Sequence, residues 1–140
     1  MDRVWDFLIC SHVIEHVPDP LKLLEDCKKI LNPGGVILAF TPNLDSYGIR
    51  EMKEFSSLVI PPSHLHYFTP KSARKLSEIV GLEFVFCETR GMDIADLASL
   101  YELRGDQKSC DSFRENFDSL QACVDQAGCA NHMRFVLRLS

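Results

Sequence analysis

The stretch Asp6-Phe-Leu-Ile-Cys-Ser-His-Val-Ile-Glu-His-Val-Pro-Asp-Pro20 decides the fold of this chain. It overlaps a run from Val4 to Cys10 that has the apolar density of a strand covered on both faces. The run stops at polar residues, and Asp19 and Pro20 then supply the residue types preferred at a helix N-cap and at the first helical position. The stretch therefore predicts a buried strand, a polar turn and a helix.

A second buried run follows the predicted helix. The turn residues Asn32-Pro-Gly-Gly35 precede Val36-Ile-Leu-Ala-Phe40, which ends at Thr41-Pro-Asn43. Two parallel strands joined by a crossover helix bring both polar ends to the same edge of a sheet. Open α/β sheets bind ligands at that edge. We therefore expect an α/β fold with a ligand site formed by these two polar ends.

The rest of the chain alternates between helical and strand patterns. Thr69-Pro70 and Gly81 bound a predicted helix, and residues 94–101 predict a shorter one. The apolar residues of 113–127 recur at spacings of four and three, which predicts a single amphipathic helix ended by Gly128. We also expect strands over 82–89 and 133–139, and a long irregular segment over 44–68 with a short helix around 47–55.

Composition narrows the classes of function. The chain has 140 residues and a net charge of −5 without a strong cluster of Lys and Arg, so we expect one domain that does not bind nucleic acid. It has no apolar run of about 18 residues and no secretion signal, so we expect no membrane span and a cytoplasmic location. Its six cysteines have no C-x-x-C spacing, and we expect reduced thiols.

Four motifs occur together in a recognisable order and spacing. They are Ser11 to Pro20, Leu31 to Gly35, Thr41 to Asn43, and Pro62-Ser-His-Leu-His-Tyr-Phe-Thr-Pro70. This set resembles the C-terminal half of the class I S-adenosylmethionine-dependent methyltransferases that act on small molecules. The resemblance implies half of a Rossmann-like sheet with strands in the order 4-5-7-6, the last strand antiparallel, and flanking helices. It also implies a single domain over 1–140, with 91–131 as a helical insertion between the last two strands.

The resemblance also implies what the cofactor site needs. In this family a glycine-rich turn after the first strand wraps S-adenosylmethionine, and an acidic residue after the second strand holds the ribose hydroxyls. The chain as given contains neither. We therefore expect a truncated product, one part of a split enzyme or a wrongly placed start codon, and a chain that is inactive as an isolated fragment.

By resemblance, the end of the first predicted strand faces the cofactor. Ser11, His12 and Val13 would line the methionyl and sulfonium region, or else form a plain strand-to-helix turn. Glu15 and His16 would border the acceptor pocket, with His16 as a candidate catalytic base. Alternatively, His16 hydrogen-bonds a neighbouring loop and fixes the turn.

The long irregular segment would cover the acceptor pocket. His64 is the first candidate for the catalytic base, and His66 and Tyr67 would contact the substrate. Alternatively, these residues pack the loop onto the sheet, with Phe68 as its anchor. Asn43 would lie beside the substrate or cap the following turn.

Two histidine pairs raise the question of a metal site. Their spacings, His12 to His16 and His64 to His66, allow the pairs to meet in principle. No cysteine or carboxylate set completes them convincingly, so we expect no metal.

The resemblance implies S-adenosylmethionine-dependent methyl transfer to an oxygen or nitrogen of a small molecule, such as a quinone precursor, a sugar or a lipid intermediate. Such transfer needs a proton removed from the acceptor and an in-line approach to the sulfonium. The alternative is a non-catalytic half-domain. A half-sheet exposes the backbone of residues 4–10, through which the chain would form a homodimer or bind a complementing N-terminal half.

Overall fold

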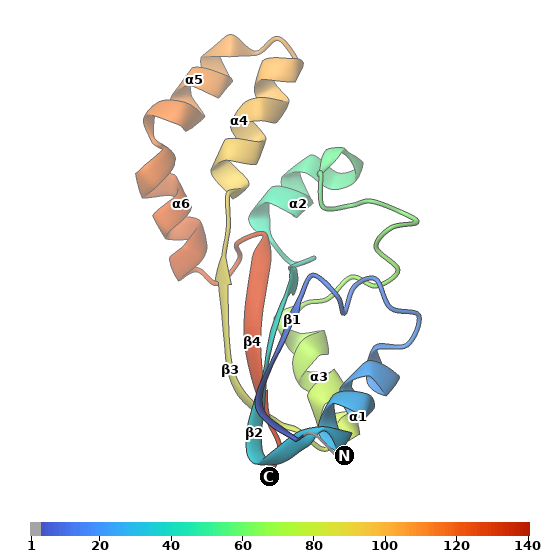
Figure 1. Cartoon of the computed structure of the whole chain (residues 1–140). Helices are drawn as coiled ribbons and strands as arrows, with labels where there is room; N and C mark the ends of the chain where they lie inside the picture. Colours follow the sequence, from blue (N-terminus) through green and yellow to red (C-terminus); the bar gives the residue numbers. More distant parts are fainter. Residues whose placement is uncertain (1–3) are drawn as a thin grey trace.

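One sheet of four strands organises the chain (Figure 1). The structure, a computed structural model, describes residues 4–140. The strands are β1 (Trp5–Ser11), β2 (Leu31–Pro42), β3 (Glu83–Arg90) and β4 (His132–Arg138). β1 and β2 are parallel, whereas β4 lies between β2 and β3 and is antiparallel to both. The order β1-β2-β4-β3 confirms the predicted half-sheet with an antiparallel last strand.

Two helices, α1 (Pro20–Lys29) and α3 (Pro70–Val80), cover one face of the sheet (Figure 1). Each begins with a side-chain cap followed by proline, as predicted. Asp19 accepts a hydrogen bond from the backbone N–H three residues on, and Thr69 forms a reciprocal capping box. The core between helices and sheet includes Leu24, Cys27, Ile37, Ala39, Ala73, Val80, Phe135 and Leu137.

The opposite face of the sheet is open along β1. Trp5, Phe7 and Ile9 are 48%, 50% and 61% exposed, whereas Leu8 and Cys10 pack against the core. In Figure 1 no helix of the described chain lies against the open face. The prediction that this strand is covered on both faces is therefore wrong for residues 4–140. An apolar strand is suited to two covering layers, and the described residues supply one of them.

Three helices follow β3 and precede β4 in the sequence: α4 (Asp93–Leu103), α5 (Gln107–Glu115) and α6 (Phe117–Gln126). The prediction of a single helix over 113–127 is wrong, because the chain breaks at Asn116 between α5 and α6. The side-chain amide of Asn116 donates to a carbonyl of the preceding turn, and such local bonds compete with helix continuation. The apolar spacing runs on across the break, so the pattern does not reveal it.

The segment between β2 and α3 contains α2 (Tyr47–Met52) and a 3-10 helix (Lys53–Phe55), which confirms the predicted short helix in an irregular segment. The segment returns to the sheet through a backbone bridge between Asn43 and Phe68. Figure 1 places α2 and α4 to α6 at the end of the sheet where β1 and β2 finish. Within the described chain, no helix has the length and apolarity to cross a membrane.

Candidate active site

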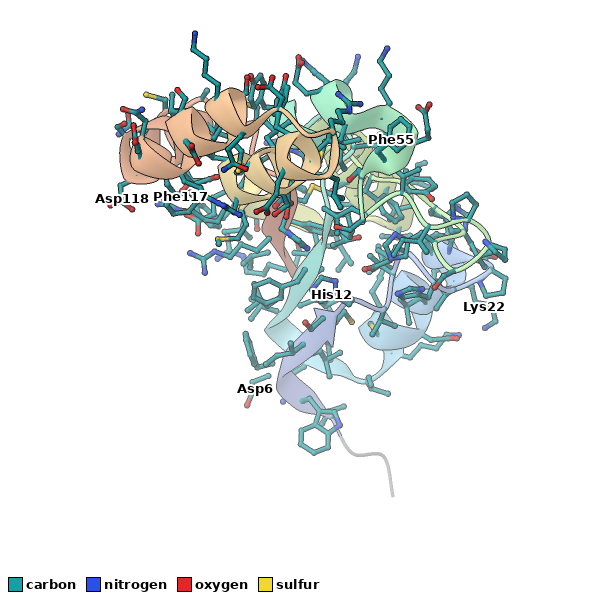
Figure 2. All side chains as sticks on the ribbon, turned by 90° about the horizontal axis from the view of Figure 1, so that it is seen from above. Asp6, His12, Lys22, Phe55, Phe117 and Asp118 are labelled. Atoms are coloured by element: carbon teal, nitrogen blue, oxygen red, sulfur yellow. The ribbon has the colours of Figure 1, made fainter. Side chains whose placement is uncertain are left out.

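The candidate site begins where β1 and β2 end. Ser11, the last residue of β1, pairs in register with Phe40, and the backbone N–H of His12 donates to the carbonyl of Phe40 at 3.0 Å. His12 then turns the chain with a φ of +52°. This left-handed conformation is uncommon for non-glycine residues and clusters at functional sites. Figure 2 shows His12 at the tip of β1, with Asp6 toward the other end of the strand.

Glu15 lies in the turn that follows and is buried, with 1% of its surface exposed. One carboxylate oxygen lies 3.2 Å from Nδ1 of His12, and the other, Oε2, has no hydrogen-bond partner among the described residues. The backbone carbonyl of Glu15 accepts hydrogen bonds from the N–H groups of Leu65 at 2.8 Å and His66 at 3.1 Å. The turn after β1 therefore tethers the long loop. It also buries a carboxylate oxygen that needs a partner.

His16 and His64 meet beside this carboxylate, with ring centroids 4.8 Å apart. Nδ1 of His16 lies 2.7 Å from the carbonyl of Ser63, and Nδ1 of His64 lies 2.9 Å from that of Leu58. Because a carbonyl only accepts, both Nδ1 atoms donate, and each neutral ring keeps its lone pair on Nε2. The alternative in which His16 fixes the turn by bonding a neighbouring loop is thus realised, and this bond leaves the lone pair of the neutral ring on Nε2.

One ligand atom from each of Glu15, His16 and His64 lies within 4.8 Å of the other two. We call this set the Glu15–His16–His64 cluster. Its two imidazole nitrogens and one carboxylate can accept protons or hold a divalent cation. The expectation that no carboxylate completes a histidine pair is wrong, because the turn after β1 brings Glu15 to the loop histidine. The expected absence of a metal itself stays a prediction.

The other two candidate residues of this loop, His66 and Tyr67, differ in their position relative to the cluster. Nε2 of His66 lies 3.3 Å from the carbonyl of Pro18, outside the cluster. Tyr67 stays with the cluster, since its ring centroid lies 6.0 Å from that of His64. The hydroxyl of Tyr67 is buried and has no hydrogen-bond partner within residues 4–140. Tyr67 is therefore better placed than His66 to contact a ligand of the cluster.

Asn43 is fully buried, whereas Ser11 and Val13 are exposed at the same edge. The amide Nδ2 of Asn43 donates to the carbonyl of Ala130 at 2.9 Å, and its Oδ1 accepts from the N–H of Asp45 at 3.2 Å. Both ends of this amide are thus used within the chain. The structure favours the turn-capping alternative for Asn43 over contact with a substrate.

The structure adds His132, which the sequence analysis missed. It is the first residue of β4, and its ring lies edge-on to that of His12 with centroids 5.5 Å apart. Burial lowers the pKa of His132, and the nearby His12 lowers it further, while Asp93 and Glu15 oppose the shift. A lone histidine at the start of a predicted strand carries no local motif, and its neighbours come from distant parts of the sequence.

The sequence profile of a methyltransferase domain matches residues 2–86. This match covers more than half of the chain. It includes β1, β2, the Glu15–His16–His64 cluster and α3, and it ends within β3.

Curated relatives agree with this match. The chain is 28% identical over 117 residues to a ubiquinone biosynthesis O-methyltransferase of Neisseria meningitidis serogroup A, which covers 81% of this chain and 47% of the relative. It is 32% identical over 111 residues to the protein of the same name from Dinoroseobacter shibae, covering 71% of this chain and 42% of the relative. The chain therefore spans less than half the length of each of these relatives.

Solved structures show the same fold. An S-adenosylmethionine-dependent methyltransferase from Thermotoga maritima superposes with a TM-score of 0.64 at 14% identity, over 99% of this chain and 57% of that one. Another from Archaeoglobus fulgidus gives a TM-score of 0.57 at 19% identity, over 98% and 60%. With the half-sheet order, the matched domain profile and the named relatives, these likenesses establish that the chain belongs to the class I S-adenosylmethionine-dependent methyltransferases.

Proposed function

We propose that this protein transfers a methyl group from S-adenosylmethionine to a hydroxyl oxygen of a small molecule, with a quinone precursor as the first acceptor to test. The observation that carries the proposal is the Glu15–His16–His64 cluster at the common edge of two parallel strands. This is the edge where open α/β sheets bind ligands. The names of the two relatives support oxygen as the accepting atom.

In this proposal the exposed tip of β1 faces the cofactor. Ser11, His12 and Val13 lie at that tip, beside the methionyl and sulfonium end of S-adenosylmethionine. A hydroxyl oxygen becomes a good nucleophile as it loses its proton, so the site needs a base within hydrogen-bond reach. His64 and His16 are the bases predicted from the sequence, and both keep Nε2 unprotonated when neutral.

The acceptor side consists of the buried polar atoms that lack partners. The carboxylate of Glu15 and the hydroxyl of Tyr67 are two such groups, and both lie next to His64. A hydroxyl of the acceptor other than the one that is methylated, such as the second hydroxyl of a catechol, can donate to the carboxylate and accept from the tyrosine, which satisfies both. His66 would contact the outer part of the acceptor from the tethered loop.

The test combines binding and turnover. Amide NMR spectra of the chain are recorded as S-adenosylmethionine is added, and the signals of Ser11, His12 and Val13 are expected to shift. Methyl-labelled cofactor is then incubated with catechol, which offers hydroxyls, and with anisole, which offers none. Label is expected on catechol alone. This proposal requires the chain to be active by itself, against the expectation from its sequence that the isolated fragment is inactive. The absence of both the shifts and the label would therefore refute the proposal.

The open face of β1 favours a second candidate function. Trp5, Phe7 and Ile9 form an exposed apolar row on β1, which is an edge strand of the sheet formed by residues 4–140 and is a ready surface for association. Under this alternative the chain is a non-catalytic half-domain that pairs through β1 with a second copy or with a complementing N-terminal half. Calorimetry and sedimentation decide between the two: tight cofactor binding by a monomer contradicts the half-domain, whereas self-association without cofactor binding supports it.

A further inference from the structure

The side-chain amide of Asn131, the residue before β4, has one favourable orientation. Asn131 is 2% exposed, its Nδ2 donates to the carboxylate of Asp96 at 2.8 Å, and its Oδ1 accepts from the N–H of Met92 at 3.3 Å. An ionised carboxylate only accepts and a backbone N–H only donates. Turning the amide over would therefore lose both bonds.

This orientation determines which nitrogen of His132 carries a hydrogen. Nδ1 of His132 lies 2.9 Å from Oδ1 of Asn131. Because Oδ1 only accepts, Nδ1 donates, and the neutral ring keeps its lone pair on Nε2. Burial, with the nearby His12, lowers the pKa of His132 against the opposing charges of Asp93 and Glu15. The neutral ring with a basic Nε2 therefore prevails near neutral pH.

The start of α4 holds this arrangement in place. Asp93 is fully buried, and its two oxygens accept hydrogen bonds from the N–H groups of Gly48 and Asn131, both at 2.9 Å. Gly91 leaves room for the amide, since a Cβ there would lie 2.0 Å from Oδ1 of Asn131. The helical segment between β3 and β4 thus fixes the beginning of β4, which gives this segment a role in the site.

His132 also lines a small surface pocket. A small pocket of about 90 Å³ is lined by Phe40, Arg90, His132, Met133 and Arg134. In the sheet, His132 pairs with Pro42 and Arg90, so the pocket lies at the same edge as the tip of β1. His64, in contrast, is 8% exposed and faces the other members of its cluster.

We infer that His132, rather than His64, takes the proton from the acceptor hydroxyl, with Asn131 as its positioning residue. The inference rests on the proposed methyl transfer. The hydroxyl proton moves to Nε2 of His132, and an oxygen lone pair forms the bond to the methyl carbon. The electrons of the broken carbon–sulfur bond go to sulfur, which leaves S-adenosylhomocysteine. The imidazolium then returns its proton to water.

The first test measures which ring nitrogen of His132 carries the hydrogen, and it does not require enzymatic turnover. Nitrogen-15 spectra of the histidine rings in the intact chain are expected to show Nδ1 of His132 protonated and Nε2 bare when the ring is neutral. Asp96→Ala removes the acceptor of the Nδ2 bond and leaves the amide of Asn131 held by the N–H of Met92 alone, so the two tautomers of His132 are expected to mix in this variant. A proton on Nε2 of His132 in the unmodified chain would overturn the inference.

The second test uses methylation of catechol. His132→Gln is expected to lower kcat by roughly 10²- to 10⁴-fold, as the loss of a general base does, with little change in the KM for the cofactor. Arg138→Gln, at the far end of the same strand, is the matched control and is expected to keep kcat.

The outcomes separate the two claims. No methylation by the unmodified protein overturns the proposed function, and this inference with it. Methylation that survives His132→Gln overturns the inference alone, and a loss in His64→Gln would then return the role to that residue. Where a variant does not fold by circular dichroism, the ring spectra of the unmodified chain decide.

Discussion

The covered and open faces of the sheet differ along β4 but carry the same kind of residue along β1. In β4, Phe135 and Leu137 are fully buried, whereas Arg134 and Arg138 stand on the open face and pair with glutamates of β3. In β1 the open face carries three large apolar side chains instead. The open face of β4 is therefore suited to water, and that of β1 to another apolar surface. The comparison predicts that a partner covers β1 and not the whole sheet.

The largest expected effect separates the two faces by stability. Phe135→Ala should lower the free energy of unfolding by about 3–5 kcal/mol, because it leaves a cavity beside the stacked ring of Phe84. Phe7→Ala should cost about 1 kcal/mol in the isolated chain, because half of that residue is already exposed to water. Urea denaturation followed by circular dichroism measures both. Equal losses would show that the open face is packed in solution.

The next effect concerns association. Ile9→Lys places a charge on the exposed row of β1 and should raise the dissociation constant of any dimer roughly tenfold or more, since burying an isoleucine is worth about 1.5–3 kcal/mol. Phe86→Lys is the control, because Phe86 is 47% exposed on β3, at the other edge of the sheet. Sedimentation of both variants tests the difference. If Phe86→Lys disrupts assembly and Ile9→Lys does not, the partner surface lies over β3.

Much of the fold could be predicted because its signals are local. Asp19 and Thr69 mark helix starts by capping chemistry, and the alternation from Met133 onward marks β4. The break at Asn116 could not be predicted, since one side-chain hydrogen bond ends a helix whose apolar spacing continues. The exposure of one face of β1 could not be predicted either. The apolar residues show that both faces of the strand are suited to burial, but they do not show whether a second layer covers it.

The candidate site shows the same division. The tip of β1 and the residues Glu15 and His16 lie within one short motif, so their proximity follows from sequence. That His64 joins them depends on a loop tethered by backbone hydrogen bonds, for which only the family resemblance gave a hint. The role inferred for His132 depends on the orientation of the Asn131 side-chain amide. Asp96 of α4, which is distant in the sequence, favours one orientation by accepting a hydrogen bond from it. No spacing pattern encodes such a contact.

The smallest expected effect is a dependence of stability on pH. His132 stands on the open face of β4, by alternation with the buried Met133. Its pKa is lowered in the folded protein from an ordinary value of 6.5, so below about pH 6.5 the unfolded chain binds the proton first. The free energy of unfolding should therefore fall as the pH drops from 6.5 to the folded pKa. His132→Gln should remove this part of the titration, which stability measurements across that range would show.

Asp96 provides a comparison of opposite sign. Burial, followed by the charge of Asp93, raises the pKa of Asp96 above its ordinary value of 3.8. Between 3.8 and the raised value the folded state holds the proton more tightly, so the free energy of unfolding falls as the pH rises through this window. A partner over β1 that also covers His132 would bury this ring more deeply and lower its folded pKa further. The pH range over which His132 affects stability would then widen. The corresponding range for Asp96, which belongs to α4, would stay the same. If this pH range for His132 is the same in the assembled protein, the partner surface lies away from His132.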